Sequence, residues 1–286
     1  MTTNEYDYQT LLAKTENEEL EQLASVYHQL ACLSFNSNRA ISFYKRSIEI
    51  NLYYRPTDYD LLSTSYNNLG ALLNKHSDYN QALKYYRCAL NTDLREPEIN
   101  QLKIATCYNN IGNILKKQGN YPEANKHFRQ ALTIQLKNVS FNDLILITTY
   151  HNLGSVYCLM KDYPLAIEYY EKSVKILEEF HPLQYSLMAY TYNKIGSVYN
   201  LMKNYAVAFS CQKKALKMQE KCISSDNPSL ATRHFNMAIA LEGLKRFEEA
   251  VDHVTQAIEI LRKTLGPHQR KIRHYQKYLD KLRQKL

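Results

Sequence analysis

The chain has 286 residues, of which 45% are hydrophobic and 22% charged, and no apolar run approaches the roughly 18 residues that a membrane-spanning helix needs. Its six cysteines include no CxxC pair and no nearby Cys/His set with metal-ligand spacing, so we expect no metal site and no cofactor. The net charge of +8 is local, because nine of the 36 lysines and arginines lie between Arg262 and Leu286 with only one of the 28 acidic residues.

Residues 1–17 are polar and contain acidic residues without an apolar core segment. This composition is not that of a signal peptide or a transit peptide. We therefore expect a flexible N-terminal segment on a cytoplasmic protein.

A period of 42 residues dominates the rest of the chain. Small residues recur in two columns and an aromatic residue in a third: Gly70, Gly112, Gly154, Gly196 and Ala238; Ala40, Ala82, Ala124, Ala166, Ala208 and Ala250; Tyr79, Tyr121, Tyr163, Tyr205 and Phe247. Such a period predicts a stack of identical supersecondary units. Residues 58–264 give five regular repeats. Residues 18–57 give a degenerate first repeat, in which Ala31 precedes Gly70 by only 39 residues.

Each unit is predicted to be a helix, a tight turn and a second helix. Between the glycine and alanine columns lie short segments of turn formers such as KHSDY, KQGNYP and MKDYP, flanked by apolar residues at helical spacing. Pro122 and Pro164 fall where a second helix would begin, which is the position that tolerates proline best. The small residues would allow two helices to approach closely, and larger ones would overpack the crossing.

Residues 265–286 are predicted to form a basic capping helix. One helical face carries apolar residues, namely Ile272, Tyr275, Leu279, Leu282 and Leu286. We expect this face to seal the sixth repeat while the lysines and arginines stay solvated.

The order of the recurring residue types within one unit, for example Tyr108, Ile111, Gly112, Ala124, Phe128 and Ala131, resembles the tetratricopeptide repeat. The 42-residue period is longer than the usual 34 and is similar to that of kinesin light chains and of the polarity adaptors that bridge Gα subunits to spindle proteins. The resemblance implies an all-α, right-handed superhelical solenoid of about six helix–turn–helix repeats plus the C-terminal cap. It also implies a non-enzymatic adaptor that binds protein partners through extended peptide segments in a concave groove.

Asparagines gather around the glycine column although asparagine is a poor helix former. By the resemblance, the first helix of each pair lines the groove, and Asn68, Asn110, Asn152 and Asn236 form a ladder for a peptide main chain, with Lys194 in the fifth position. A carboxamide offers both a donor and an acceptor to such a chain. We expect the groove to include Asn67, Asn109, Asn113, Asn193, Lys194, Lys116 and Lys117, with the lysines favouring an acidic ligand, and the ladder side chains to point into solvent when no ligand is bound. The alternative is that the asparagines only cover a solvated helix face.

No catalytic motif is present, since the glycines lie within helices and no GxSxG, HExxH or kinase set occurs, and we expect no small-molecule substrate. Two other functions stay open. The chain could be the regulatory or targeting module of a larger enzyme or motor complex, or its basic C-terminal helix could bind nucleic acid or anionic membranes, which we favour less. The 25 tyrosines are explained mostly by repeat packing rather than by base stacking.

Overall fold

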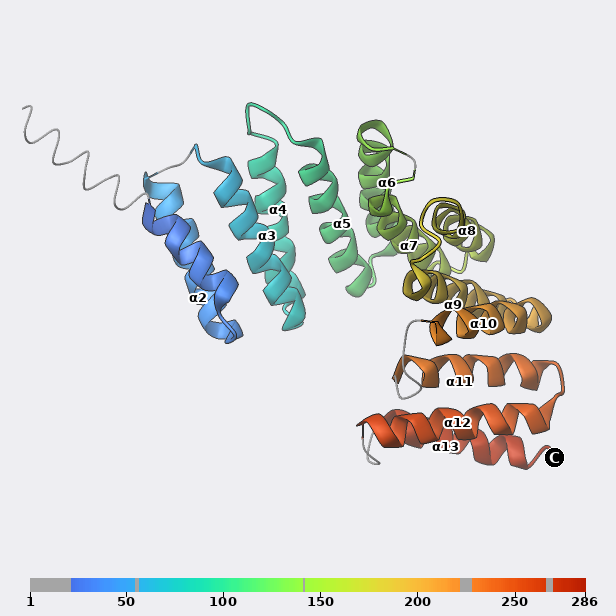
Figure 1. Cartoon of the computed structure of the whole chain (residues 1–286). Coiled ribbons are helices and arrows are strands. Elements are labelled where there is room, and N and C mark those ends of the chain that lie inside the picture. Colours follow the sequence, from blue (N-terminus) through green and yellow to red (C-terminus); the bar gives the residue numbers. More distant parts are fainter. Residues whose placement is uncertain (1–21, 55–56, 141, 222–227, 266–269) are drawn as a thin grey trace, which may run out of the picture. The chain divides into compact units, whose positions relative to one another are not determined.

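The computed structural model describes residues 22–54, 57–140, 142–221, 228–265 and 270–286, and all regular secondary structure in these ranges is helical (Figure 1). The expected flexible segment 1–17 lies outside them. A first helix covers residues 22–33. It is followed by α2 (Ser37–Tyr54), α3 (Tyr59–Lys75), α4 (Tyr79–Asp93), α5 (Gln101–Lys117), α6 (Tyr121–Asn138), α7 (Leu144–Leu159), α8 (Tyr163–Phe180), α9 (Tyr185–Leu201), α10 (Tyr205–Glu220), α11 (Pro228–Gly243), α12 (Phe247–Leu265) and α13 (Arg270–Arg283).

The helices pack as successive hairpins, which confirms the predicted helix–turn–helix repeat. The strongest packing joins α3 to α4, α5 to α6, α7 to α8, α9 to α10 and α11 to α12. The aromatic column marks the first residue of each second helix, namely Tyr79, Tyr121, Tyr163, Tyr205 and Phe247. Pro122 and Pro164 lie in the first turns of α6 and α8, as predicted.

The turn inside each hairpin follows one backbone pattern. The residue two positions before each second helix has a left-handed backbone conformation. Its φ lies between 62° and 82° at Ser77, Gly119, Lys161, Lys203 and Lys245. In four of these turns the side chain of the next residue caps the second helix, as when Asp162 Oδ1 accepts a hydrogen bond from the Leu165 amide at 3.3 Å. Four of the five left-handed positions are not glycine, so the sequence alone did not identify them.

The glycine column makes room for a ring from the paired helix. A Cβ built at Gly112 would lie 2.7 Å from Phe128 Cε1, and one at Gly154 would lie 2.8 Å from Tyr170 Cε1. Phe128 is fully buried, and so is Ala124 of the alanine column. The predicted packing reason for the small residues is therefore confirmed in these hairpins.

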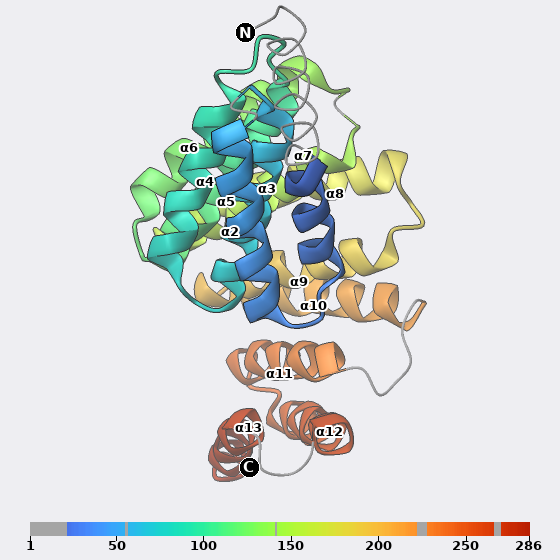
Figure 2. The ribbon, with the colours of Figure 1, turned by 90° about the vertical axis from the view of Figure 1, so that its left-hand side faces the viewer.

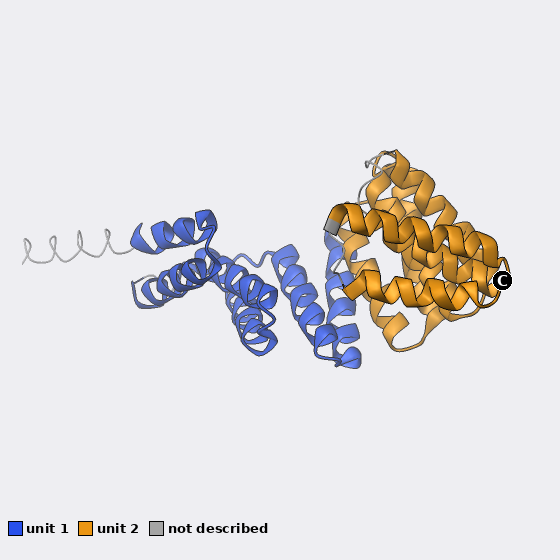
Figure 3. Cartoon of the chain, turned by 90° about the horizontal axis from the view of Figure 1, so that it is seen from below, with its two compact units in different colours: residues 1–139 blue, residues 140–286 orange. Residues whose placement is uncertain are grey.

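The chain divides into two compact units, residues 1–139 and 140–286 (Figure 3). In the second unit α13 lies alongside α12 (Figure 2). Its Ile272, Tyr275, Leu279 and Leu282 are buried in one core with α11 and α12, and the Tyr275 ring stacks on Phe235 at a centroid distance of 3.9 Å. The capping helix is confirmed.

One residue of the predicted apolar stripe does not take part in this core. Leu286 follows the end of α13 and is 65% exposed, so its assignment to the buried stripe was wrong. Among the described residues, no helix is long and apolar enough to cross a bilayer.

Candidate peptide-binding surface

In unit 1 the first helices of two neighbouring repeats, α3 and α5, are joined by three polar contacts. Each contact links a residue to the one 43 positions later, so the two helices run in parallel. Since the repeat is 42 residues long, each residue of α3 faces the residue that follows its equivalent in α5, an offset of one residue. Along each helix the contacts are seven residues apart, which is two helical turns or about 10.5 Å. We call the surface that carries them the α3–α5 face; its contacts are Asp60–Lys103, Asn67–Asn110 and Asn74–Lys117.

The middle contact of the α3–α5 face is a pair of carboxamides. Asn110 Nδ2 donates to Asn67 Oδ1 at 2.8 Å, and both side chains are half-buried. The bond uses one of the two N–H groups of Asn110 and one lone pair of Asn67. The pair therefore keeps the Nδ2 donors of Asn67 and the Oδ1 acceptor of Asn110 for a further group.

The expectation that the ladder side chains point into solvent is wrong for Asn110 and Asn236. Both are held by an asparagine of the preceding first helix, because a constant offset brings the second asparagine of one repeat to the first asparagine of its neighbour. Asn68 makes a side-chain hydrogen bond with Tyr44 of α2. Asn109 is only 8% exposed and so lies largely between the helices.

The lysines predicted for the groove stand at the end of α5. Lys117 Nζ donates to Asn74 Oδ1 at 2.7 Å and lies 5.2 Å from the centre of the Tyr79 ring. Lys116 Nζ lies 5.6 Å from the centre of the Phe128 ring. A carboxamide and an aromatic face orient an ammonium without cancelling its charge, so Lys117 stays a cation at the end of α5. Asn113, one turn earlier, is half-buried.

Unit 2 repeats the carboxamide pair. Asn236 Nδ2 of α11 donates to Asn193 Oδ1 of α9 at 2.9 Å and lies 3.3 Å from Ser197 Oγ. Asn200 Nδ2 reaches the Asn236 carbonyl at 3.2 Å. Asn152 is half-buried on α7. The pair in unit 2 thus has the same register as the pair in unit 1.

Histidine occupies the equivalent position in α7. His151 Nε2 lies 2.9 Å from Thr191 Oγ1, which in turn donates to the Leu187 carbonyl at 2.8 Å. The threonine hydrogen is therefore used, and His151 must carry its proton on Nε2. Burial, and then the charge of Lys194, lower the pKa of His151 to about 4. Lys194 lies 5.1 Å from the centre of the Tyr190 ring.

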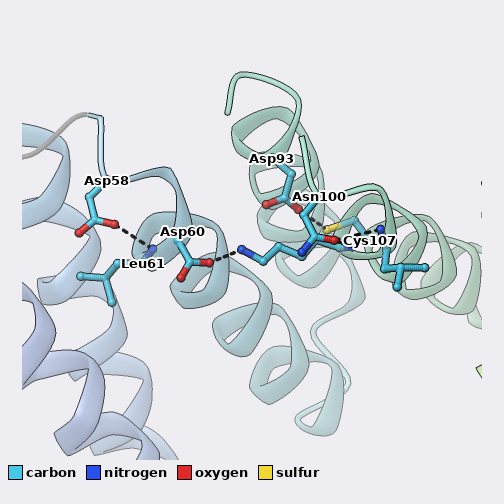
Figure 4. Close-up of polar contacts among 8 residues, drawn as sticks. Asp58, Asp60, Leu61, Asp93, Asn100 and Cys107 are labelled. Carbon is cyan, nitrogen blue, oxygen red and sulfur yellow. Dashed lines mark hydrogen bonds and ion pairs between the residues drawn. The ribbon is translucent and has the colours of Figure 1, made fainter. Parts of the chain in front are cut away.

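Sequence reasoning found the asparagines but missed the outer contacts of the α3–α5 face. Asp60 and Lys103 form an ion pair near the start of the two helices (Figure 4), and Asn74 holds Lys117 near their end. The signal was present in the sequence as polar residues at a seven-residue spacing, 60, 67 and 74 in one helix and 103, 110 and 117 in the next.

Within the described ranges, no group of three or more His, Cys, Asp or Glu side chains could hold a metal ion. Five cysteines lie in those ranges and all are free thiols, namely Cys32, Cys88, Cys107, Cys158 and Cys211.

A family model described as tetratricopeptide repeat matches residues 60–137, 103–179 and 187–263, which together make up more than half of the chain. The chain belongs to the tetratricopeptide repeat family. No curated protein matches its sequence significantly. The recognition of the family from the columns of small and aromatic residues is thereby confirmed.

Solved tetratricopeptide repeat structures share the fold at low sequence identity. BtubC (BKLC) from P. vanneervenii has a TM-score of 0.71 at 20% identity, over 82% of this chain and 95% of that one. The apo form of RapI has a TM-score of 0.66 at 16% identity, over 92% and 98% of the two chains. A putative kinesin light chain from Podospora anserina, with nearly identical TPR-like repeats, has a TM-score of 0.61 at 16% identity, over 71% and 97%. The expected likeness to kinesin light chains is confirmed at the level of the fold.

Proposed function

We propose that this protein is a non-enzymatic adaptor that holds an extended, acidic segment of a protein partner against its first helices. The tetratricopeptide repeat fold supports a role as a protein-interaction scaffold. The observation that carries the proposal is the carboxamide pair Asn67–Asn110, which keeps a donor and an acceptor for a further group. A peptide group offers the complementary acceptor and donor in a fixed geometry.

The spacing of the α3–α5 face suits an extended main chain. Contacts about 10.5 Å apart match about three residues of a strand that rises about 3.3 Å per residue. Asn67 and Asn110 would bind one peptide group, and the polar groups at either end would bind others three residues away. Each such bond contributes about 0.5–1.5 kcal/mol net, so affinity requires several of them together.

Acidic residues of the ligand would lie at the basic end of α5. Lys117 is oriented there by the Tyr79 ring and by Asn74, and a carboxylate would replace these contacts with an ion pair, while Lys116 beside it would add positive charge. Part of the affinity would then fall with ionic strength.

The same mode would extend to the unit 2 pair, Asn193–Asn236. Asn68, Asn113 and Asn152 would add contacts at their own positions, and Asn109, only 8% exposed, would support the pair from between the helices. Lys194 would supply a cation where the ladder lacks an asparagine. The continuous ladder through Asn68, Asn110, Asn152 and Asn236 stays a prediction, as does the cytoplasmic location.

The basic C-terminal helix is better explained as a cap than as a site for nucleic acid or membranes. Its apolar face is buried in unit 2, and Glu242 of α11 binds Lys285 at 2.5 Å and also accepts from the Tyr278 hydroxyl. These contacts anchor α13 and neutralise part of its charge.

The test compares a variant that lacks the carboxamide pair with a control variant that lacks two asparagines outside the α3–α5 face. The wild type is first used to capture and identify a partner, whose bound segment is then made as a peptide. The dissociation constant of this peptide is measured for wild type, for Asn67→Ala with Asn110→Ala, and for Asn91→Ala with Asn138→Ala, whose asparagines are exposed on second helices. Removing both members of a pair leaves no orphaned partner, so the fold should tolerate it.

We expect the Asn67/Asn110 variant to bind at least tenfold more weakly than wild type and the Asn91/Asn138 variant to bind equally well, with similar melting temperatures for all three. Equal binding by all three proteins would reduce the asparagines to a packing feature. Replacing Lys116 and Lys117 with glutamine should flatten the dependence of the dissociation constant on salt.

A further inference from the structure

Beside the carboxamide pair, unit 1 contains a pocket of about 290 Å³ between α3, the end of α4 and the first half of α5. Seven of its nine lining residues are polar and one of them is Asn67, so the pocket adjoins the α3–α5 face. The other lining residues that matter here are Thr64, Asp93, Asn100, Lys103 and Thr106. Figure 4 shows Asp93, the last residue of α4, close to Asn100 and to Cys107 of α5.

Asp93 is a buried carboxylate that the protein satisfies only in part. The side chain ends α4 and the residue is 1% exposed. Its Oδ2 accepts from the Cys107 thiol at 3.3 Å, whereas its Oδ1 is buried without a hydrogen-bond partner among the described residues. Burial, and then the nearby charge of Asp93, raise the pKa of Cys107, so the thiol stays a protonated but weak donor.

Leaving a carboxylate in this state is costly, because a buried acceptor without a donor loses about 1–3 kcal/mol and a charged one loses more. The other five repeats bury no charge here, although Asn51 is also buried without a hydrogen-bond partner for its carboxamide among the described residues. At the equivalent positions they carry uncharged residues, which are Asn51, Gln135, Leu177, Gln219 and Leu261. Packing alone therefore does not require an acid at this place in the repeat.

The charges around the pocket are unbalanced. Lys103 is bound to Asp60, and this bond, followed by the charges of Asp60, Glu96 and Asp93, raises the pKa of Lys103 against the effect of its burial. Three carboxylates thus share one lysine. Because that lysine is held at Asp60 (Figure 4), it forms no hydrogen bond with Asp93. The arrangement leaves a net negative site next to an open volume, which favours a second cation.

We propose that this pocket receives the side chain of a lysine or arginine from the bound peptide, and that the Asp93 side chain turns so that Oδ1, buried in the free protein, pairs with the charged end of that residue. The inference rests on the proposed function, since Asn67 belongs both to the peptide-binding pair and to the pocket wall. A buried water alone would satisfy Asp93, but the pocket is roughly ten times the ~30 Å³ that one water occupies.

The geometry also sets where this basic residue lies in the ligand. Thr106 of the pocket and Lys117 of the basic end are 11 residues apart on α5, or about 16 Å, which an extended chain covers in about five residues. The ligand would carry its basic residue about five positions from its acidic ones.

The test uses small probes and so does not depend on knowing the partner. Nα-acetyl-lysine methylamide, Nα-acetyl-arginine methylamide and the uncharged Nα-acetyl-citrulline methylamide are titrated into the ¹⁵N-labelled full chain. Amide shifts of Thr64, Thr106 and Cys107 report binding. The variants are Asp93→Asn and, as a matched loss of one negative charge outside the pocket, Glu98→Gln on the exposed α4–α5 loop.

We expect both cations to bind wild type at least tenfold more tightly than the citrulline probe, and Asp93→Asn to abolish this preference while Glu98→Gln keeps it. We also expect Asp93→Asn to melt at or above the wild-type temperature, because it removes an unsatisfied charge. No binding of the cations, equal binding of citrulline, or equal binding to Asp93→Asn would each overturn the proposal. A failure of the Asn67/Asn110 test with cation binding intact would instead refute only the peptide-binding role of the pair.

Discussion

The contact between the glycine column and the second helix makes a quantitative prediction through Gly112 and Phe128. A Cβ at Gly112 would lie 2.7, 2.9 and 3.0 Å from three atoms of a ring that is fully buried. Favourable carbon–carbon contacts are about 3.5–4.0 Å long, so the ring or the helix must shift. Overpacking of this kind costs about 1–3 kcal/mol, while alanine improves helix propensity by about 1 kcal/mol. The difference predicts that Gly112→Ala destabilises by about 0–2 kcal/mol.

The chain itself suggests the compensating change. In the sixth repeat the small column carries Ala238, and the residue 16 positions later, where Phe128 stands relative to Gly112, is Val254. Both are fully buried. Phe128→Val alone should lose about 2–3 kcal/mol, since complete truncation of a buried phenylalanine to alanine loses about 3–5. In the double variant the valine leaves space for the new Cβ.

The double variant should therefore be about 1–3 kcal/mol more stable than the sum of the single losses predicts, as expected for residues in contact. Urea unfolding of wild type, both single variants and the double variant, followed by circular dichroism at 222 nm, measures this coupling. Gly70→Ala serves as a milder control, because a Cβ there comes no closer than 3.0 Å to Tyr86. Additive losses, within about 0.5 kcal/mol, would show that the ring does not set the size of the glycine column.

Three further outcomes are expected. Because the pKa of His151 is lowered to about 4, this histidine binds more protons in the unfolded chain than in the folded one between pH 4 and 6.5. His151 alone should lower the free energy of unfolding by roughly 2 kcal/mol from pH 7 to 5, in addition to the loss from His234, whose pKa is also lowered to about 4. Urea midpoints at both pH values should show that His151→Asn loses its own part of this pH dependence. A chain ending at Leu265 should melt at a lower temperature and bind an apolar dye, since α13 covers α11 and α12; unchanged melting would contradict the cap. Asp162→Ala should cost about 1 kcal/mol in a thermal melt through loss of the α8 cap, and Asp162→Ser should restore most of it.

The sequence predicted the repeat well because each regular feature leaves one residue per period. Tyr121 marks the start of a second helix, Gly112 marks a close crossing, and Ile272 with Leu279 marks the buried side of the cap. Each of these follows from the local chain and its nearest neighbour in the hairpin. Because the same residue types recur from repeat to repeat, an exception in one repeat does not hide the pattern.

The candidate site was harder to predict because it depends on the offset between first helices of neighbouring repeats. An offset of zero would have set Asn67 beside Asn109, whereas the observed offset of one sets it beside Asn110 and sends Asn109 largely out of solvent. The Asp93 pocket is formed by three helices, and its excess of negative charge depends on side chains from all of them. In the sequence, its only indication was an acidic residue at a repeat position that is uncharged in the other five repeats. A comparison of the equivalent positions in the six repeats could have singled out Asp93.

The constant offset between first helices also limits how such a chain can change in length during evolution. If the repeat formed by α5 and α6 were deleted and the offset kept, Asp60 would face Ile145, Asn74 would face Leu159, and Asn67 would face Asn152. The outer ion pair and the lysine contact would be lost, but the carboxamide pair would form again. The carboxamide pair of α3 would therefore survive this deletion, because Asn152 stands where Asn110 stood, whereas the two outer contacts need the residues of α5.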